Sequence, residues 1–396
     1  MATLEHVQTK NFDAVVAIRG RLAVVGGTLM AARQNGGVIG LDRRTGQTRW
    51  ERADVPTLAA AGDGAAFAYA RTGLLVALDP DGAEVWRAAL PDDRAAPARE
   101  RGDAVAPFVP DVLTAGEYVH VAAGGDVIQL RRDDGSVERR VRAARGERGA
   151  VARLAGAHGL ILVTCTQRTP WDDERYPSGG LPWQPPIPLE ARRLRGADLV
   201  AYDVNLRERW RCPPPSAELV YGNGLPVAAD AGAIACTALH LKADAEGQPY
   251  VDLFQGALLL MDAASGRVRW WRLFADGGTG QHDPVAVAGG IVTSFNCARF
   301  DSADGRQTWA LRADAFHVDN RVQPVRHRDS LLTLGNGAIL AIDARDGAVR
   351  QVARLAEPPF HARATTDLLV QDDTVYVGWR DAGGVTRLSA RRLLTL

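Results

Sequence analysis

Three histidines stand at matching places late in the chain, each just before a segment that is typical of a first β-strand. They occur in "DGGTGQHDP", "DAFHVDNRVQP" and "EPPFHARATTD". Acidic and amide residues lie beside them, and "VYGNGLP" brings similar groups to the corresponding place one repeat earlier. The full candidate set is Tyr221, Asn223, His282, Asp283, His317, Asp319, Asn320 and His361. Such groups, where they converge, can bind a metal ion, a phosphate or a polar ligand.

A structural interpretation competes with this ligand hypothesis, because polar groups around a channel mouth also bond backbone and trapped water. The spacing between repeats also exceeds what one metal ion normally tolerates, so no metal site is assigned. No Ser-His-Asp order, phosphate loop or paired-carboxylate spacing is present, and no catalytic residue is proposed.

A second candidate site is a long insertion, residues 167–196, "QRTPWDDERYPSGGLPWQPPIPLEARRLRG". It contains six prolines together with Trp171, Tyr176 and Trp183. Proline-rich backbone is stiff, and exposed Trp and Tyr are favoured anchors of protein interfaces. These three aromatics are therefore predicted to bind a partner protein. The alternative is that they cap their own sheet and pack the loop onto it.

Two further segments are longer than a minimal fold needs, namely residues 91–111 and 239–256. The first is a linker between repeats, and the second has the pattern of an extended hairpin. All three insertions are expected to emerge on one face of the molecule, opposite the tight turns described next.

These candidates are positioned by a short phrase that recurs along the chain. Examples are "LDRRTGQTRW" at 41–50, "MDAASGRVRW" at 261–270 and "FDSADGRQTW" at 300–309. Its Asp can accept bonds from backbone amides of a tight turn, its Gly supplies a positive φ, and its Trp offers a flat apolar face. A Trp that recurs once per repeat predicts packing between repeats. The seven anchor positions are Asp42, Asp79, Arg131, Asp203, Asp262, Asp301 and Asp343.

The repeat has the four short strands of a β-propeller blade, within about forty residues where it carries no insertion. The last segment, "DLLVQDDTVYVGWRDAGGVTRLSARRLLTL", supplies three strands of an eighth blade. The N-terminal segment 1–12 is expected to supply the fourth and close the ring. The prediction is a single all-β domain over residues 1–396, an eight-bladed propeller with seven blades as the alternative.

The strand, Asp turn, Gly, strand and Trp pattern resembles the tryptophan-docking repeats of quinoprotein-like propellers. That group includes pyrroloquinoline-quinone (PQQ) dehydrogenases and non-enzymatic members such as the propeller lipoprotein of the BAM complex. The enzyme branch implies adjacent cysteines over the cofactor, but Cys165, Cys212, Cys236 and Cys297 are scattered. The resemblance is therefore taken to favour a non-enzymatic scaffold without PQQ.

Composition narrows the function classes further. Lys+Arg and Asp+Glu both number 47, so the formal net charge is zero, which argues against a general binder of nucleic acid or membrane surfaces. The first residues, "MATLEHVQTKNF", lack the pattern of a secretory signal, and no apolar run reaches 18 residues. The expected location is the cytoplasm. The main hypothesis is a protein-binding scaffold, and the alternative is a ligand- or metal-binding module or enzyme centred on the channel mouth.

Overall fold

The computed structural model describes most of the strands and their tight turns. It covers residues 8–15, 18–33, 36–62, 64–70, 74–90, 111–145, 149–167, 198–221, 225–230, 232–243, 249–275, 283–293, 297–311, 322–335, 337–355, 363–364, 368–380 and 385–393. The chain divides into two compact units. Unit 1 comprises Met1–Ala89 and Thr308–Leu396, and unit 2 comprises Leu90–Gln307.

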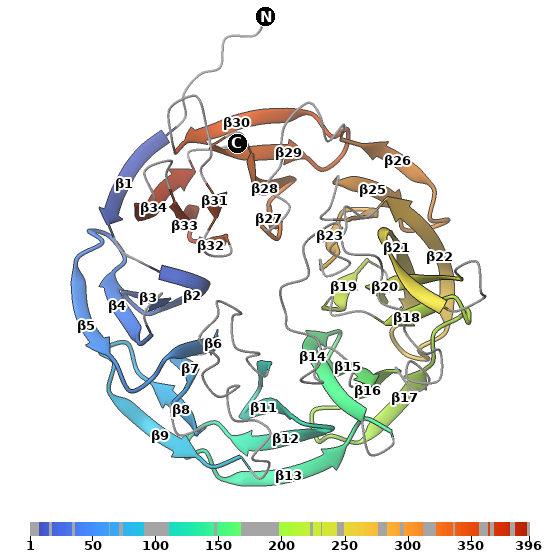
Figure 1. The fold of residues 1–396 in the computed structure, drawn as a ribbon, viewed down its shortest axis with the longest axis horizontal. Helices are drawn as coiled ribbons and strands as arrows, with labels where there is room; N and C mark the ends of the chain where they lie inside the picture. The colour runs from blue at the N-terminus through green and yellow to red at the C-terminus, as the bar shows by residue number, and fades with distance from the viewer. Residues whose placement is uncertain are drawn as a thin grey trace, which may run out of the picture. The chain divides into compact units, whose positions relative to one another are not determined.

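Unit 1 contains four antiparallel sheets, numbered here as blades 1, 2, 7 and 8 (Figure 1). Blade 1 has β2 (Ile18–Val25), β3 (Thr28–Arg33), β4 (Val38–Asp42) and β5 (Thr48–Arg52). Blade 2 has β6 (Thr57–Gly62), β7 (Ala65–Tyr69), β8 (Leu75–Leu78) and β9 (Glu84–Ala88). Blade 7 has β27 (Val325–His327), β28 (Ser330–Gly335), β29 (Ala338–Asp343) and β30 (Val349–Arg354). Blade 8 has β31 (Arg363–Ala364), β32 (Leu369–Gln371), β33 (Thr374–Arg380), β34 (Thr386–Leu393) and β1 (Gln8–Val15).

Unit 2 contains blades 3 to 6, except that β26 of blade 6 runs across the unit boundary. Blade 3 has β10 (Val112–Ala115), β11 (Tyr118–Ala123), β12 (Asp126–Arg131) and β13 (Val137–Arg142). Blade 4 has β14 (Gly149–Ala157), β15 (Leu160–Gln167), β16 (Leu199–Tyr202) and β17 (Glu208–Cys212). Blade 5 has β18 (Leu219–Tyr221), β19 (Val227–Ala229), β20 (Ala233–Ala243), β21 (Pro249–Asp262) and β22 (Val268–Ala275). Blade 6 has β23 (Val285–Val287), β24 (Gly290–Val292), β25 (Ala298–Asp301) and β26 (Gln307–Ala310).

Eight meandering antiparallel sheets with no helix among the described residues make the chain an eight-bladed β-propeller, as the sequence predicts. Blades 5 and 8 each have five strands, because two short strands together take the place of the first strand. In blade 5, β18 and β19 both pair with β20, and in blade 8, β31 and β32 both pair with β33.

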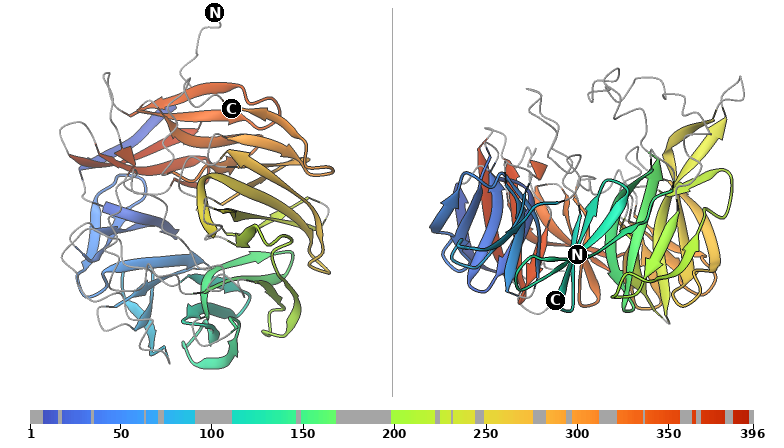
Figure 2. Two further views of the ribbon diagram at one scale, coloured as in Figure 1. Left: turned by 45° about the vertical axis from the view of Figure 1, so that its right-hand side comes forward. Right: turned by 90° about the horizontal axis from the view of Figure 1, so that it is seen from below.

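The expected closing strand is also present. Strand β1 pairs antiparallel with β34, from Gln8 opposite Leu393 to Val15 opposite Arg387, with a bulge between Lys10 and Phe12 (Figures 1 and 2). The first described strand of the chain therefore completes a sheet whose other strands lie at its C-terminal end. This pairing covers an edge of β34 that would otherwise stay open.

The tight turns are built as their sequence indicates. In β4–β5, Asp42 Oδ1 accepts hydrogen bonds from the backbone amides of Arg44 and Thr45, at 3.0 and 2.9 Å. Gly46 follows with φ of 72°. Such a left-handed backbone is costly for a residue with a side chain, so the turn requires its glycine.

The repeated tryptophans pack onto the next blade. The indole Nε1 of Trp50, Trp210, Trp270 and Trp309 donates to a backbone carbonyl one residue after the next anchor, on Pro80, Ala263, Ser302 and Ala344 respectively. Each ring also lies against the turn glycine of that blade. A Cβ added to these glycines would fall between 2.5 and 2.9 Å from ring atoms, at Gly82, Gly266, Gly305 and Gly347. The packing role predicted for the repeated Trp is thus confirmed at four junctions.

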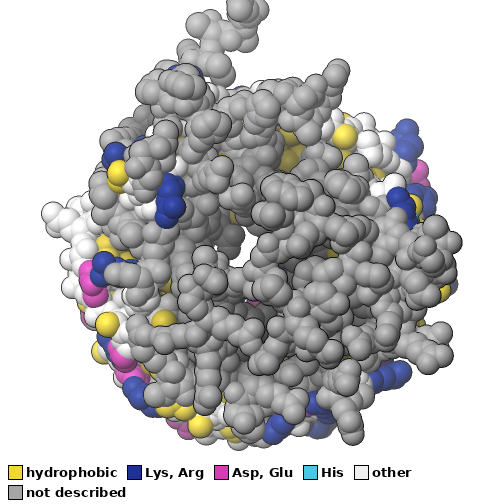
Figure 3. All heavy atoms as spheres, in the orientation of Figure 1, with side chains coloured by type: hydrophobic (Ala, Val, Ile, Leu, Met, Phe, Trp, Pro, Cys, Tyr) yellow, Lys and Arg dark blue, Asp and Glu magenta, His cyan; other side chains and the backbone are white. Residues whose placement is uncertain are grey.

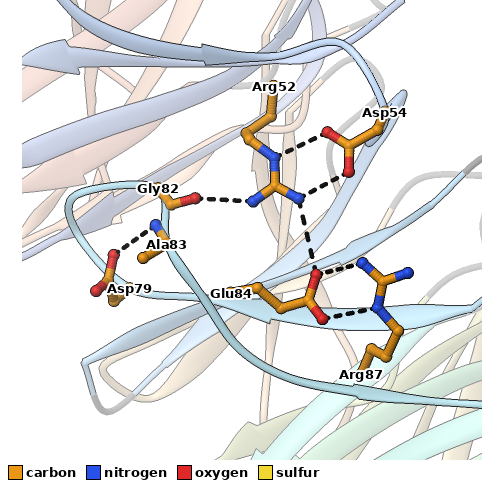
Figure 4. Close-up of polar contacts among 7 residues, drawn as sticks. All are labelled: Arg52, Asp54, Asp79, Gly82, Ala83, Glu84 and Arg87. Carbon is orange, nitrogen blue, oxygen red and sulfur yellow. Dashed lines mark hydrogen bonds and ion pairs between the residues drawn. The ribbon is translucent and has the colours of Figure 1, made fainter.

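An ion network surrounds one of these contacts, between blades 1 and 2 (Figure 4). Arg52 donates 2.9 Å to the carbonyl of Gly82, and its guanidinium makes two bonds to Asp54, at 2.8 and 2.7 Å. It also lies 3.8 Å from Glu84, which is bonded to Arg87. The turn that receives Trp50 is therefore held by the same strand that carries Trp50.

Blades 3, 7 and 8 lack the tryptophan, and for blades 3 and 7 the irregularity has a structural counterpart in the following blade. Blade 3 has Arg139 at the Trp position, and the turn of blade 4 has Leu206, with φ of 54°, in place of glycine. Blade 7 has Gln351 there, and blade 8 has the two chain ends, β34 and β1, where that turn would be. A Trp is thus missing at both places where the next blade offers no glycine turn, and it is also missing from β1 of blade 8, although the turn of blade 1 has Gly46.

Substituting the turn glycines tests the docking contact. Gly266→Ala is expected to cost about 1–2 kcal/mol for left-handed backbone and about 1–3 kcal/mol more for overlap with Trp210. Gly159→Ala is the matched control, because Gly159 has a similar φ of 74° but no heavy atom of the described residues within 4 Å of an added Cβ. It should show the backbone cost alone. Urea unfolding curves measure both, and equal losses would contradict the contact.

Removing the closing strand tests the pairing of β1 with β34. Deletion of residues 1–15 should lower the melting temperature and produce self-association, because β34 gains a free edge. Deletion of residues 1–7, which stops before β1, is the control and should change neither. Light scattering on a sizing column and a thermal melt give the result. A monomeric 1–15 deletion with unchanged melting temperature would show that β1 is dispensable.

Candidate functional site

Most of the residues singled out from the sequence lie outside the described residues. These are Trp171, Tyr176, Trp183, Asn223, His282, His317, Asp319, Asn320 and His361. Tyr221 and Asp283 are described, and both belong to unit 2.

Tyr221 lies inside strand β18 rather than in the connection before the first strand, which corrects its predicted position. The side chain is 2% exposed, and its hydroxyl donates to Cys212 Sγ at 3.3 Å. The reason is that the first strand of blade 5 is split, so the residues ahead of its break already pair with β20. Burial raises the pKa of this phenol well above its usual value. Tyr221 therefore packs between blades 4 and 5, in a core that also holds Leu219 and Cys236.

Asp283 takes part in an ion network that connects four blades of unit 2. Its Oδ1 accepts a 2.5 Å bond from the amide of Leu225 in blade 5 and lies 3.7 Å from Arg153 Nη1 in blade 4. Arg153 Nε in turn donates 2.8 Å to Asp111 at the start of blade 3. Asp111 is 6% exposed and also accepts a bond from the amide of Leu154 at 3.1 Å. One guanidinium thus connects carboxylates that are 172 positions apart in the sequence, at 111 and 283.

A second carboxylate–arginine pair lies where the chain enters β16, directly after the longest insertion. Asp198, 4% exposed, is the first described residue after residues 168–197, and Arg211 Nη1 donates to its Oδ2 at 3.2 Å. Arg211 also donates to the carbonyl of Ala143 in blade 3 and to Glu208. Burial opposes its charge, but the bonds to Glu208 and Asp198 outweigh that effect and raise the pKa of Arg211. Arg145, mostly exposed, lies 3.7 Å from the same Asp198 oxygen.

Strand register places these anchors at one edge of unit 2. Arg153 is opposite Thr164, Thr164 is opposite Leu199, and Leu199 is opposite Cys212. The row therefore runs across all four strands of blade 4, next to Asp198. It marks the end of the blade at which β15 stops and β16 begins, which is the end that carries residues 168–197.

Blade 5 is lengthened at the corresponding end. Strands β20 and β21 continue pairing past Leu239 opposite Gly256, through a bulge, to Ala243 opposite Pro249. The hairpin extends past the other strands of its unit in Figure 2. Within segment 239–256, β20 and β21 therefore pair as an extension of the blade, and Leu241 is fixed at the base of this extension by a 2.7 Å bond from its amide to the carbonyl of Glu218.

The described residues offer little reactive chemistry. No three His, Cys, Asp or Glu side chains among them gather closely enough to hold a metal ion. The four cysteines are buried and form no disulfide with one another, and burial raises the pKa of Cys165 and of Cys297 to about 12, so neither thiol is ionised near neutral pH. In the part of the chain that the structure describes, no helix is long and apolar enough to cross a membrane.

The visible surface carries both signs of charge. On the face drawn in Figure 3, described Lys and Arg side chains lie near Asp and Glu side chains rather than in one large patch of a single sign. This agrees with the zero formal net charge.

Sequence reasoning missed the anchors Asp111, Asp198, Arg153 and Arg211. A partial signal existed, because Asp198 directly precedes an apolar strand in "ADLVAY", and Asp126 does so in "GDVIQL". Asp126 is also buried and pairs with Arg140 and Arg142. An isolated Asp before an inner strand, with an Arg on the outer strand of the same blade, is the pattern that identifies such anchors.

Comparison with known proteins agrees with this architecture. Residues 197–391 match the family model described as outer membrane protein assembly factor BamB. The structure of BamB from Moraxella catarrhalis superposes with a TM-score of 0.61 at 15% identity, covering 98% of this chain and 100% of that one. A europium-containing methanol dehydrogenase superposes with a TM-score of 0.64 at 12% identity, covering 98% and 94%. No curated protein matches the sequence.

Identities this low establish a shared fold and leave activity open, since propellers of one architecture serve many functions. The repeat, the eight blades and the family match over residues 197–391 agree with the quinoprotein-like (PQQ-like) β-propeller family that the sequence resembles.

Removing the charge of Asp111 tests the anchor network. Asp111→Asn should destabilise the protein by about 1.5–3 kcal/mol, the usual range for hydrogen bonds to charged groups, because Arg153 loses its charged acceptor. Asp133→Asn is the control, since Asp133 pairs with Arg131 but its side chain is 67% exposed. That substitution should leave urea unfolding unchanged, because exposed pairs contribute little. Similar behaviour of both variants would show that Asp111 is not an anchor.

Proposed function

We propose that this propeller is a non-enzymatic scaffold that binds another protein through the insertion-bearing edge of unit 2. The recognition element is the segment 167–196, with Trp171, Tyr176 and Trp183 as its anchors. No catalytic residue, metal or PQQ is part of the proposal.

The observation that carries the proposal is that buried ion pairs fix the chain where two of the insertions join their strands. Segments 91–111 and 167–196 each lead into a buried carboxylate, Asp111 or Asp198, that is held by an arginine of blade 4. Arg153 and Arg211 are themselves well buried, with side chains 20% and 12% exposed. Charged anchors of this kind fix the point and direction at which a loop departs.

Fixed roots matter because ordering a loop is costly. Each residue held in one backbone conformation costs about 1–2 kcal/mol, so a binding loop that is pre-positioned and proline-rich loses less entropy on binding. The 167–196 segment combines six prolines with three large aromatics, the residue types that dominate binding energy at protein interfaces. Blade 5 adds its extended hairpin at the corresponding end of its sheet.

The comparisons favour the same choice between classes. The family model that matches residues 197–391 is described as an assembly factor, whereas the dehydrogenase likeness rests on fold alone at 12% identity. Adjacent cysteines, which the enzyme branch implies, are absent from the sequence.

Replacing residues 168–197 with a short Gly-Ser link tests the proposal. The variant should stay folded, because its flanking strands are fixed by the bond from the amide of Cys165 to the carbonyl of Asp198. It should lose a partner protein that the intact chain captures in stoichiometric amount, and the double variant Trp171→Ser with Trp183→Ser should weaken capture at least tenfold.

Arg345→Glu is the matched control, because Arg345 lies on a tight turn of blade 7 with its side chain 80% exposed. Capture should be unchanged in this variant. If loss of the insertion leaves capture intact while Arg345→Glu abolishes it, the working face is the one with the tight turns. A small molecule that copurifies in equimolar amount with the pure chain would favour the ligand-binding alternative.

A further inference from the structure

The contact between blades 3 and 4 is built differently from the other blade contacts described above. At those junctions an indole N–H donates to the carbonyl that follows the turn anchor. In blade 4 that carbonyl belongs to Val204, and it accepts a 2.6 Å bond from Gln129 Nε2 instead. Arg139, which stands at the Trp position, donates 2.7 Å to the carbonyl of Asn205. A side-chain amide and a guanidinium thus replace one tryptophan.

The glycine is replaced as well. Leu206 takes its place with a left-handed φ of 54°, a conformation that is unfavourable for a residue with a side chain. Leu206 is 2% exposed and packs in a core shared by blades 3 and 4, with Ala122 and Val151. Its side chain thus adds apolar packing at this junction, but the residue retains the backbone strain.

A buried histidine completes the junction. His120 is fully buried on β11, opposite Gln129 on β12, and the two Nε2 atoms are 3.2 Å apart. Because Gln129 Nε2 also donates to Val204, its amide orientation is fixed, and this nitrogen is a donor to the histidine ring as well. His120 must therefore be neutral, with Nε2 as the acceptor. Its Nδ1 then carries the proton, and among the described residues that atom has no hydrogen-bond partner of standard geometry.

We propose that the blade 3–blade 4 junction is an acid-sensitive seam, the first blade contact of unit 2 to open. Protonation of His120 at Nε2 turns the acceptor of the Gln129 amide into a second donor. Gln129 then cannot keep both of its bonds, and the carbonyl of Val204 loses the contact that replaces the indole. A Trp–Gly junction has no titratable group at this place and does not respond in this way.

The electrostatic environment agrees with this direction. Desolvation lowers the pKa of His120 to about 4, against the opposing effect of carbonyls of Val204 and Leu113. In the open seam the ring is hydrated, with a pKa near its ordinary value of about 6.5. The open state therefore binds the proton more tightly, so the closed seam is most stable above about pH 6.5 and weakens as pH falls towards 4. Between pH 7 and pH 5 the opening constant should rise roughly twentyfold.

The described residues of the neighbouring elements bring no competing charge onto the ring. Strands β10 and β12 place Leu113 and Gln129 beside it, and the turn of blade 4 presents a carbonyl. The ring centroid of Tyr118 lies 6.2 Å from that of His120. The other ionisable groups of the packed elements have partners elsewhere: Arg139 bonds to Asn205, and Arg153 bonds to Asp111. Asp203 accepts a bond from the amide of Asn205 in its own turn, and His158 bonds to the carbonyls of Ala229 and Ala233.

Amide hydrogen exchange of the intact chain tests the seam. The matched probes are the turn amides of Asp203 and Leu206 in blade 4 and of Asp301 and Gly305 in blade 6, which make equivalent bonds within their turns. After correction for intrinsic rates, the blade 4 amides should open at least tenfold more often at pH 7. Lowering the pH to 5 should raise their opening roughly twentyfold and leave the blade 6 amides unchanged.

Two variants separate the seam from general acid instability. His120→Leu should abolish the acid response of the blade 4 amides, whereas His240→Leu, at another buried histidine, should retain it. Arg139→Trp with Leu206→Gly rebuilds the missing docking pair and should slow opening about tenfold, which keeps the proposal testable if His120→Leu does not fold. Equal opening in blades 4 and 6 at pH 7, or an acid response that survives His120→Leu, would overturn the proposal.

Discussion

The contact of an indole ring with a glycine in the next blade is the interaction on which the rest of this fold depends. A blade of four short strands buries too little by itself, and stacking of neighbours creates a continuous core. The indole supplies a large apolar face and one hydrogen bond, and the glycine lets backbone and ring approach closely. Gly305 illustrates both demands, with φ of 71° and a missing Cβ that would lie 2.7 Å from Trp270.

This contact also explains where the repeat fails. Since the ring docks on the glycine turn, a blade whose neighbour lacks that turn has no use for the Trp. The pairs Arg139 with Leu206, and Gln351 with the chain ends of blade 8, are the two described cases. At the first, polar groups and a strained leucine take over. The regular Trp–Gly junctions stabilise the stack of blades. The proposed acid response lies at the irregular blade 3–blade 4 junction, and the proposed partner binding lies at the insertion-bearing edge.

The fold was readable from the sequence because its determinants are local. The Asp turn, its glycine and the following Trp lie within nine residues, as in Asp262 to Trp270, and each repeat restates the same geometry. The anchors of the candidate site were not readable, because they depend on distant pairings. Arg153 meets Asp111 and Asp283, which lie 42 positions before it and 130 positions after it. Tyr221 was misplaced for a local reason, since nothing in "VYGNGLP" reveals that the first strand of blade 5 is split.

The absence of glycine in the fourth copy and of Trp in the third were both visible in the sequence. Their connection was not, because it requires knowing that the ring of one blade docks on the turn of the next. Once the docking of ring on turn is known, the sequence is more informative. Leu206, in place of the turn glycine, identifies the junction at which the Trp contact is replaced.

The most direct test of the docking contact is a double-mutant cycle on Trp270 and Gly305, measured by urea unfolding. If the ring and the missing Cβ meet as described, Gly305→Ala should be costly in the native background. In the Trp270→Ala background it should cost only about 1–2 kcal/mol, the backbone strain that remains. The coupling energy should then be about 1–3 kcal/mol. Strict additivity of the two substitutions would contradict the account.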